Sequence, residues 1–291
     1  MANENASPSP ARPVKTARVA GSPALSVDHA GDGELVLFLH GVGGNKINWT
    51  RQLQTFAPHF LAAAWDMRGY GSSDDYDGPL QFADLSDDLL RVLRHFGADR
   101  VHLVGLSMGG RIAFDFLHRH PDRVRSLTIC SASHRASQMS PERRAAFLAS
   151  RLRPLQEGRT PADIAPDVAR SLMGPNASEQ AYRSLVESMC LLHADGYMKA
   201  LTAVSTYEGE IALESIEVPT HVVAASEDRL IPPEVMRPMA ECIRGAVYTE
   251  IADSGHLSNL EQAEAFERAV LGFLLRHRGA PAAGRREGAS T

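Results

Sequence analysis

Residues 101–110 read VHLVGLSMGG, a stretch that places Ser107 between two glycines at the end of an apolar run. The residues before Ser107 have the apolar character of a buried strand, and residues 111–117 have the spacing of a helix. A serine at so sharp a turn adopts strained backbone geometry that exposes its hydroxyl, while Gly105 and Gly109 permit close backbone approach. The first N–H groups of the helix point toward negative charge that develops beside the serine. The stretch therefore predicts a nucleophilic serine; the alternative is a glycine-rich helix start with a serine cap.

The composition narrows the class of protein. The 291 residues are 44% hydrophobic, which is enough for one large domain with an insertion. A formal net charge of −5, without a basic stripe, indicates no nucleic-acid partner. Cys130, Cys190 and Cys242 are far apart, so we expect reduced thiols and a cytoplasmic protein. No stretch has the length of a transmembrane helix and residues 1–11 lack a secretory apolar core, so we expect no membrane partner.

Apolar runs alternate with helical patterns along most of the chain. Strand-like runs lie at 35–39, 60–65, 101–104, 124–130, 220–225 and 246–251, and helical patterns at 82–96, 111–118, 234–243 and 261–277. This alternation predicts an α/β fold with a mostly parallel central sheet and helices on both faces. The interval 133–208 breaks the rhythm, because it contains helical pieces and no good strand. These pieces are 141–152, 161–173 and 178–206.

We interpret the interval 133–208 as a helical cap inserted into the sheet domain, whose two parts are 23–132 and 209–277. The two ends of the chain, 1–22 and 278–291, are rich in small and polar residues and are expected to be disordered.

A serine hydroxyl is a poor nucleophile unless a base removes its proton and a carboxylate fixes the tautomer of that base. Asp228 follows the strand-like run 220–225, and His256 follows the run 246–251. Ligands bind at the carboxyl ends of strands in open α/β sheets, so these groups can meet Ser107 at one edge. We therefore expect Ser107 as nucleophile, His256 as base and Asp228 as the orienting acid.

Other acids and histidines compete for these roles. Glu227 and Asp253 are rival acids, although Asp253 lies only three residues from His256 and would more naturally bind loop backbone. Asp228 itself has an alternative role as a cap for the helix that follows it. Of the other histidines, His102 is expected at the surface.

Taken together, these motifs resemble the α/β-hydrolase superfamily over about residues 24–277. They are His40-Gly41, residues 65–74 (WDMRGYGSSD), residues 105–110 (GLSMGG), Asp228 and Gly255-His256. The resemblance implies an oxyanion hole formed by the backbone N–H groups of Met108 and Val42. It also implies that Asp66, Arg68 and Asp74 belong to a structural turn, and we expect His40 to hold its loop by hydrogen bonding.

Within that superfamily, the chain is most similar to 3-oxoadipate enol-lactonases and related carboxylic-ester hydrolases. The similarity rests on GLSMGG, on the segment 190–203 and on residues 255–262 (GHLSNLEQ). It implies a small-molecule ester or lactone substrate, cleaved through an acyl-enzyme on Ser107, with no metal or organic cofactor. Residues 40–43 and the longer, arginine-rich segment 134–178 depart from the enol-lactonase pattern.

A carboxylated lactone would require cations near the cap. Arg135 and Arg111 are the candidates for binding such a substrate, with a surface role as the alternative for each. The sequence leaves homo-oligomerisation open.

Three other functions remain open for the same motifs. A C–C bond hydrolase of aromatic ring-cleavage products has the same triad, but usually carries tryptophan where this chain has Leu257. Perhydrolase or haloperoxidase activity is a variant of the hydrolase reading, whereas a haloalkane dehalogenase would need aspartate at Ser107. A ligand-binding protein of this fold, without turnover, is the alternative from a different class.

Overall fold

The structure is a computed structural model that describes residues 12–279. Its strands are β1 Lys15–Val19, β2 Leu25–Ala30, β3 Leu35–Leu39, β4 Leu61–Asp66, β5 Val101–Leu106, β6 Val124–Cys130, β7 Thr220–Ala225 and β8 Val247–Ile251. Its helices are α1 Thr50–Phe56, α2 Phe82–His95, α3 Met108–Arg119, α4 Pro141–Gln156, α5 Pro161–Leu172, α6 Glu179–Cys190, α7 Ala194–Thr206, α8 Pro233–Cys242, α9 Ser258–Glu261 and α10 Ala263–Arg276.

The strands of residues 12–279 form one sheet of eight in the order β1-β2-β4-β3-β5-β6-β7-β8. In this order, every neighbouring pair from β4 to β8 is parallel. The pairs β1–β2 and β2–β4, at one edge of the sheet, are antiparallel. The mostly parallel sheet predicted from the apolar runs is therefore confirmed. Each of the six predicted strands is present, with ends shifted by two residues at most.

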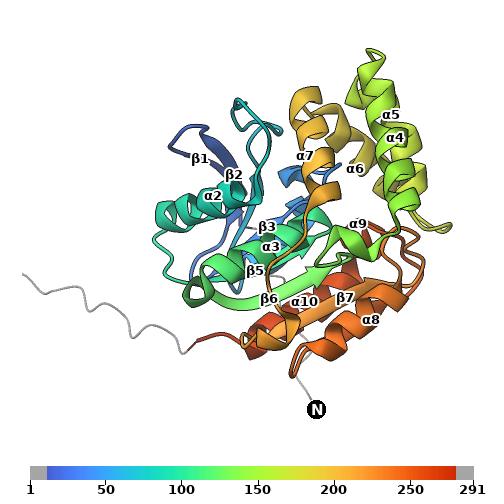
Figure 1. The fold of residues 1–291 in the computed structure, drawn as a ribbon. Coiled ribbons are helices and arrows are strands. Elements are labelled where there is room, and N and C mark those ends of the chain that lie inside the picture. Colours follow the sequence, from blue (N-terminus) through green and yellow to red (C-terminus); the bar gives the residue numbers. More distant parts are fainter. Residues whose placement is uncertain (1–11, 280–291) are drawn as a thin grey trace, which may run out of the picture.

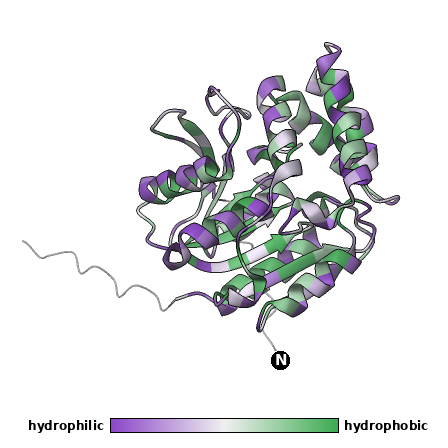
Figure 2. Cartoon of the chain, viewed as in Figure 1, coloured by the Kyte–Doolittle hydropathy of each residue, from purple (hydrophilic) through white to green (hydrophobic). Residues whose placement is uncertain are grey.

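Helices cover both faces of the sheet (Figure 1). Helices α2 and α3 pack against each other, with α3 over β3, β5 and β6, whereas α1 and α10 pack together and reach β4 and β8. Because both faces are covered, the central strands are almost fully buried and largely apolar, and the hydrophobic colour is concentrated on them (Figure 2). Within residues 12–279, none of the helices has the length and apolar character needed to cross a membrane.

Helices α4 to α7 lie between β6 and β7 in the chain and gather together at one end of the molecule (Figure 1). Their starts are encoded locally: Ser140, Thr160 and Ser178 cap α4, α5 and α6 by accepting a backbone N–H. These are the helical pieces expected of a cap. The exact limits of that cap, 133 and 208, remain a prediction.

The single helical piece expected over 178–206 is wrong, because it consists of α6 and α7 with a break at 191–193. Tertiary contacts make the break. Leu192 forms an isolated β-bridge with Tyr70, and the His193 ring lies 2.7 Å from the Asp75 carboxylate through Nδ1. The loop after β4 therefore interrupts the helix, which the local helical pattern does not reveal.

The expectation of a disordered segment over residues 1–22 is wrong for its second half. Residues 15–19 form β1, paired with β2 in register from Lys15–His29 to Val19–Leu25. Only Val19 of this strand is buried, so the strand is ordered by its partner and not by its own apolar content. Residues 1–11 and 280–291, the rest of the two segments expected to be disordered, lie outside the described residues.

The glycines on either side of Ser107 allow α3 to lie directly against the sheet. A Cβ added to Gly109 would lie 2.1 Å from the backbone oxygen of Leu39, at the end of β3. A Cβ on Gly105 would lie 2.3 Å from the oxygen of Gly109. These are backbone atoms that cannot move aside, so glycine is required at both positions.

Gly109→Ala should therefore destabilise the protein, because α3 must move away from β3. We expect the free energy of unfolding, measured by urea denaturation, to fall by about 2–3 kcal/mol. Gly272→Ala is the matched control, since a Cβ there meets only a flexible arginine end at 3.8 Å. Because alanine is the better helix former, the control should gain up to about 1 kcal/mol. Equal effects of the two substitutions would contradict this account.

Candidate active site

Ser107 lies between the end of β5 and the first residue of α3 in a strained conformation, with φ 55° and ψ −116°. The turn is held by backbone hydrogen bonds: Ser107 N donates to Cys130 O at 2.9 Å, and Gly110 N donates to Ser107 O at 2.9 Å. A positive φ is unusual for a residue with a side chain and costs energy that the surrounding backbone must supply. The strain places the Ser107 side chain at a cavity, as expected from the turn.

Asp228 and His256 meet at the same edge of the sheet. Nδ1 of His256 lies 2.7 Å from Oδ2 of Asp228, and both residues are almost fully buried. The other oxygen of Asp228 accepts the N–H groups of Leu230 at 2.9 Å and Ile231 at 3.0 Å. An ionised carboxylate can only accept, so Nδ1 carries the proton and Nε2 is left as an acceptor, as a general base requires.

Neither rival acid is placed to do this. Glu227 and Asp253 are both exposed, and within residues 12–279 the only carboxylate hydrogen-bonded to the His256 ring is that of Asp228. Asp253 instead has φ 52° and forms part of the turn before His256. The alternative role of Asp228 as a helix cap is not realised: α8 has no side-chain cap, and the two N–H groups that Asp228 accepts belong to Leu230 and Ile231 in the loop before it.

The two backbone amides expected to form an oxyanion hole have free donors. Within residues 12–279, neither Met108 N–H nor Val42 N–H donates a hydrogen bond. The loop of Val42 is held by hydrogen bonds to its carbonyl oxygens: the Tyr70 hydroxyl donates to Val42 O at 2.9 Å, and His40 Nδ1 lies 2.8 Å from Gly41 O.

His40 is held in one neutral tautomer. Its Nε2 accepts the N–H of Met67 at 3.2 Å, so Nδ1 must donate to the Gly41 carbonyl. Full burial lowers the pKa of His40, which disfavours protonation of the ring. The expectation that His40 holds the loop agrees with these contacts.

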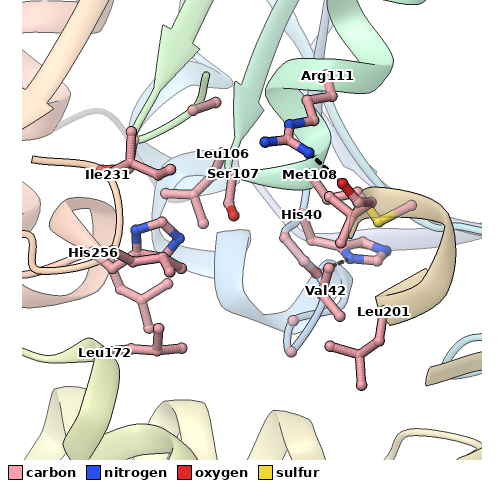
Figure 3. A pocket seen from close by; sticks show the side chains of 18 of the residues that line it. His40, Val42, Leu106, Ser107, Met108, Arg111, Leu172, Leu201, Ile231 and His256 are labelled. Atoms are coloured by element: carbon pink, nitrogen blue, oxygen red, sulfur yellow. Dashed lines mark hydrogen bonds between the residues drawn. The ribbon is translucent and has the colours of Figure 1, made fainter. Parts of the chain in front are cut away.

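Ser107, His256, Val42 and Met108 line one cavity, which has about 1050 Å³ of empty space including its open side. Ser107 lies between His256 and Arg111 in Figure 3, and Leu172 and Leu201 from the helices of 133–208 form the opposite side. Most of the remaining lining is apolar. The site is therefore a cleft between the sheet edge and helices α4 to α7. No group of three or more His, Cys, Asp or Glu side chains in the described part of the chain is placed to hold a metal ion.

Comparison with known families assigns this arrangement. The family model described as alpha/beta hydrolase fold matches residues 34–263, which include the serine turn and both partner loops. The chain belongs to the α/β-hydrolase family. As an α/β-hydrolase, it also resembles solved enzymes: a thermophilic esterase from Thermogutta terrifontis is 26% identical, with a TM-score of 0.82, over 91% of this chain and all of that one.

Curated relatives of this α/β-hydrolase have more than one activity in their names. A protein of Azorhizobium caulinodans, provisionally named carbamate hydrolase RutD, is 28% identical over 84% of this chain and 96% of its own. The 3-oxoadipate enol-lactonase 2 of Acinetobacter baylyi is 24% identical over 82% of this chain and 88% of its own. The relatives support hydrolysis, and they differ in the bond that they are named for.

Arg111 lines the cavity of the hydrolase but is not free to bind a substrate directly. Its guanidinium donates to Ser133 O at 3.0 Å, to Ser133 Oγ at 2.8 Å, to Arg135 O at 3.3 Å and to Val204 O. It therefore ties α3 to the loop after β6 and to α7. Burial lowers the pKa of Arg111 to about 10, so it remains charged at neutral pH.

The structure gives no support to the candidate role of Arg135 in substrate binding. Arg135 is exposed, lies outside the cavity lining and donates to Gly209 O at 3.3 Å. Its backbone also pairs with Glu208 in an isolated bridge. Proximity to the end of β6 in sequence did not reveal this pairing.

The structure also places the residues that were expected at the surface or in a structural turn. His102, expected at the surface, is fully buried on the central strand β5, with Nδ1 2.7 Å from Ser126 Oγ. Asp66, Arg68 and Asp74 lie outside the cavity lining and tie the turn after β4 to other segments, in agreement with a structural role. Their partners are the backbone of Ser72, Lys46 and Ala24 and the carboxylate of Asp88.

Two groups of functional residues were not predicted. Arg144 and Arg151 on α4 line the cavity, and only the high arginine content of 134–178 pointed toward them. Glu261, which lies in the stretch GHLSNLEQ, was not predicted to contact the loop of His256. Its carboxylate accepts the N–H groups of Gly255 at 3.0 Å and Leu257 at 3.1 Å, one on each side of His256.

Glu261 also joins the loop of His256 to the segment after α5. The same carboxylate accepts Gly174 N–H at 2.8 Å, and His256 N–H donates to Leu172 O at 2.8 Å. A Cβ on Gly255 would lie 2.3 Å from Gly174 N, so the two segments are in direct backbone contact. The position of His256 therefore depends on the segment after α5 as well as on the sheet.

Glu261→Ala should slow the reaction of Ser107 with a fluorophosphonate probe by about 10- to 100-fold, because His256 loses its positioning. The free energy of unfolding should fall by roughly 2 kcal/mol, since three backbone donors lose a charged acceptor. Glu261→Gln, which keeps a carbonyl oxygen, should recover part of the rate. Glu264→Ala is the control, because Glu264 is exposed on the neighbouring helix. An unchanged labelling rate in folded Glu261→Ala would refute the positioning role.

Proposed function

We propose that this α/β-hydrolase is a serine hydrolase that cleaves a carboxylic ester or a lactone through an acyl-enzyme on Ser107. The observation that carries the proposal is the 2.7 Å contact between buried Asp228 and His256, whose ring lines one cavity with Ser107. A buried Asp–His pair next to a strained serine has the geometry of nucleophilic catalysis.

In the first half of the reaction, Ser107 Oγ attacks the substrate carbonyl while its proton passes to Nε2 of His256. Asp228 stabilises the imidazolium that forms, and the carbonyl oxygen becomes an oxyanion near the N–H groups of Val42 and Met108. Collapse of this intermediate breaks the bond to the leaving oxygen, which takes the proton from His256. In a lactone the leaving alcohol stays attached to the acyl group.

In the second half, water attacks the acyl-enzyme while His256 takes one of its protons. A second oxyanion forms at the same amides and collapses, breaking the Ser107 ester and returning the proton to Ser107 Oγ. The acid product and free enzyme remain. The proposal needs no metal or organic cofactor for any of these steps.

Carbamate hydrolysis is a second candidate, favoured by the 28% identity to a protein provisionally named for that activity. The same residues would serve, because a carbamate also has a carbonyl that Ser107 can attack. Relative rates with p-nitrophenyl butyrate and phenyl carbamate separate the two proposals.

Ser107→Ala should lower kcat for p-nitrophenyl butyrate by at least about a thousandfold, because the attacking oxygen is removed. Circular dichroism should show an unchanged fold. Equal negligible rates for the native and substituted proteins would refute the enzyme proposal and favour a ligand-binding protein of this fold.

Asp228→Asn should lower kcat by about ten-thousandfold, since an amide at this place favours the wrong imidazole tautomer. Asp253→Asn is the matched control on the neighbouring loop, and its kcat should stay within about threefold of the native value. A large loss in the Asp253 variant with a small loss in the Asp228 variant would show that the orienting acid is misassigned.

A further inference from the structure

The cavity beside Ser107 is positively charged, although the whole chain has a formal net charge of −5. Three arginines line it, Arg111, Arg144 and Arg151, and its lining within residues 12–279 contains neither aspartate nor glutamate. Arginines at surfaces normally have carboxylates among their neighbours. A cavity with three cations and no acid is therefore arranged for an anionic guest.

Arg151 is the cation with the most unused hydrogen-bonding capacity. It lies on α4, and its guanidinium donates to Ser171 Oγ at 2.7 Å and to Ser150 Oγ at 3.1 Å. Both acceptors are neutral hydroxyls, and within residues 12–279 no carboxylate lies within 4.0 Å of it. A guanidinium has five N–H donors, so three remain on a side chain that lines the cavity.

The contacts and the partial burial of Arg151 favour an anionic ligand beside its guanidinium. The guanidinium carbon of Arg151 lies 5.5 Å from the centre of the Phe147 ring, and Phe147 also lines the cavity. This cation–π contact holds the guanidinium beside the ring. Partial burial without a carboxylate lowers the pKa of Arg151, which marks its charge as uncompensated. An anion that enters the cavity would offset this cost.

Arg144 and Arg111 extend the positive charge. The nearest carboxylate oxygen to Arg144 belongs to Glu208, at 3.9 Å, and that carboxylate already accepts Ser137 N–H and Ser137 Oγ–H. Arg111 has four of its five donors occupied by carbonyl and hydroxyl oxygens. Arg144 thus has donors left for an anion, and Arg111 contributes a fixed positive charge to the same cavity.

We propose that the substrate is an ester or lactone that also carries a carboxylate, which Arg151 and Arg144 bind at the cap while the scissile carbonyl lies at Ser107. The inference rests on the proposed function. Much of the remaining lining is apolar, which suits a substrate body that is a short alkyl chain or ring. The apolar residues are Phe147, Val168, Leu172, Leu201, Val204 and Ile231.

The test compares two esters that differ only in charge, p-nitrophenyl hydrogen adipate and its methyl ester. The native enzyme should have the higher kcat/KM for the anionic ester, mainly through a lower KM. Arg151→Gln should reduce kcat/KM for the anionic ester by roughly 30-fold or more, because a partly buried charge pair is lost. The methyl ester should change by less than about threefold. Arg151→Lys, which keeps the charge but not the fork of donors, should be intermediate.

Arg153→Gln is the matched control on the same helix. Arg153 is 79% exposed, pairs with Glu157 at 2.8 Å and lies outside the cavity lining. We expect this variant to have the native kcat/KM for both esters. A second readout does not need turnover: calorimetric titration should show adipate binding to the native protein and to Arg153→Gln, and none to Arg151→Gln.

The outcomes separate the two proposals. If both esters are hydrolysed and Arg151→Gln slows them by the same factor, the anion site is refuted and the hydrolase proposal stands. If neither ester is hydrolysed but adipate binds through Arg151, the hydrolase proposal fails and the anion site stands. If adipate does not bind and the two esters react equally well, the anion site is refuted.

Discussion

The contact between α3 and the end of β3 is the constraint on which the site depends. Gly109 lies so close to Leu39 that a single methyl group would reach 2.1 Å from the backbone oxygen. This proximity forces the chain to turn within one residue, and Ser107 takes a positive φ to do so. The strain is supported by hydrogen bonds to β6 and within α3. The same turn leaves the Met108 N–H without a partner, next to the serine that would attack.

A second set of contacts positions the other side of the site. Asp228 is held by two backbone N–H groups and in turn contacts His256, so the orientation of the imidazole depends on the loop between β7 and α8. The loop of His256 is bound from outside by Glu261 and by Leu172 O. The segment after α5 is therefore part of the support of the histidine, besides forming a wall of the cavity.

Charge is distributed unevenly between the two sides of the cavity. On the sheet side, His40 is neutral and fixed by two backbone contacts, and it contributes no charge near Ser107. On the other side, Arg151 and Arg144 come from α4 and have only hydroxyl partners or a distant carboxylate. The proposed chemistry and the proposed choice of substrate thus depend on different segments, β-strand ends for the first and α4 for the second.

The sequence by itself determined the elements whose signals are local. The apolar runs predicted the parallel strands, and Gly105, Ser107 and Gly109 predicted the turn, because strand apolarity and glycine requirements are set by neighbouring residues. The places of Asp228 and His256 after strand ends predicted that these two side chains meet, since parallel strands deliver their ends to one edge. Only the tertiary structure decided the rest. β1 is ordered by pairing with β2, the break between α6 and α7 is made by the loop after β4, and Arg151 lines the cavity whereas Arg135 does not. Each of these depends on a partner far away in the chain, and a local pattern carries no information about that partner.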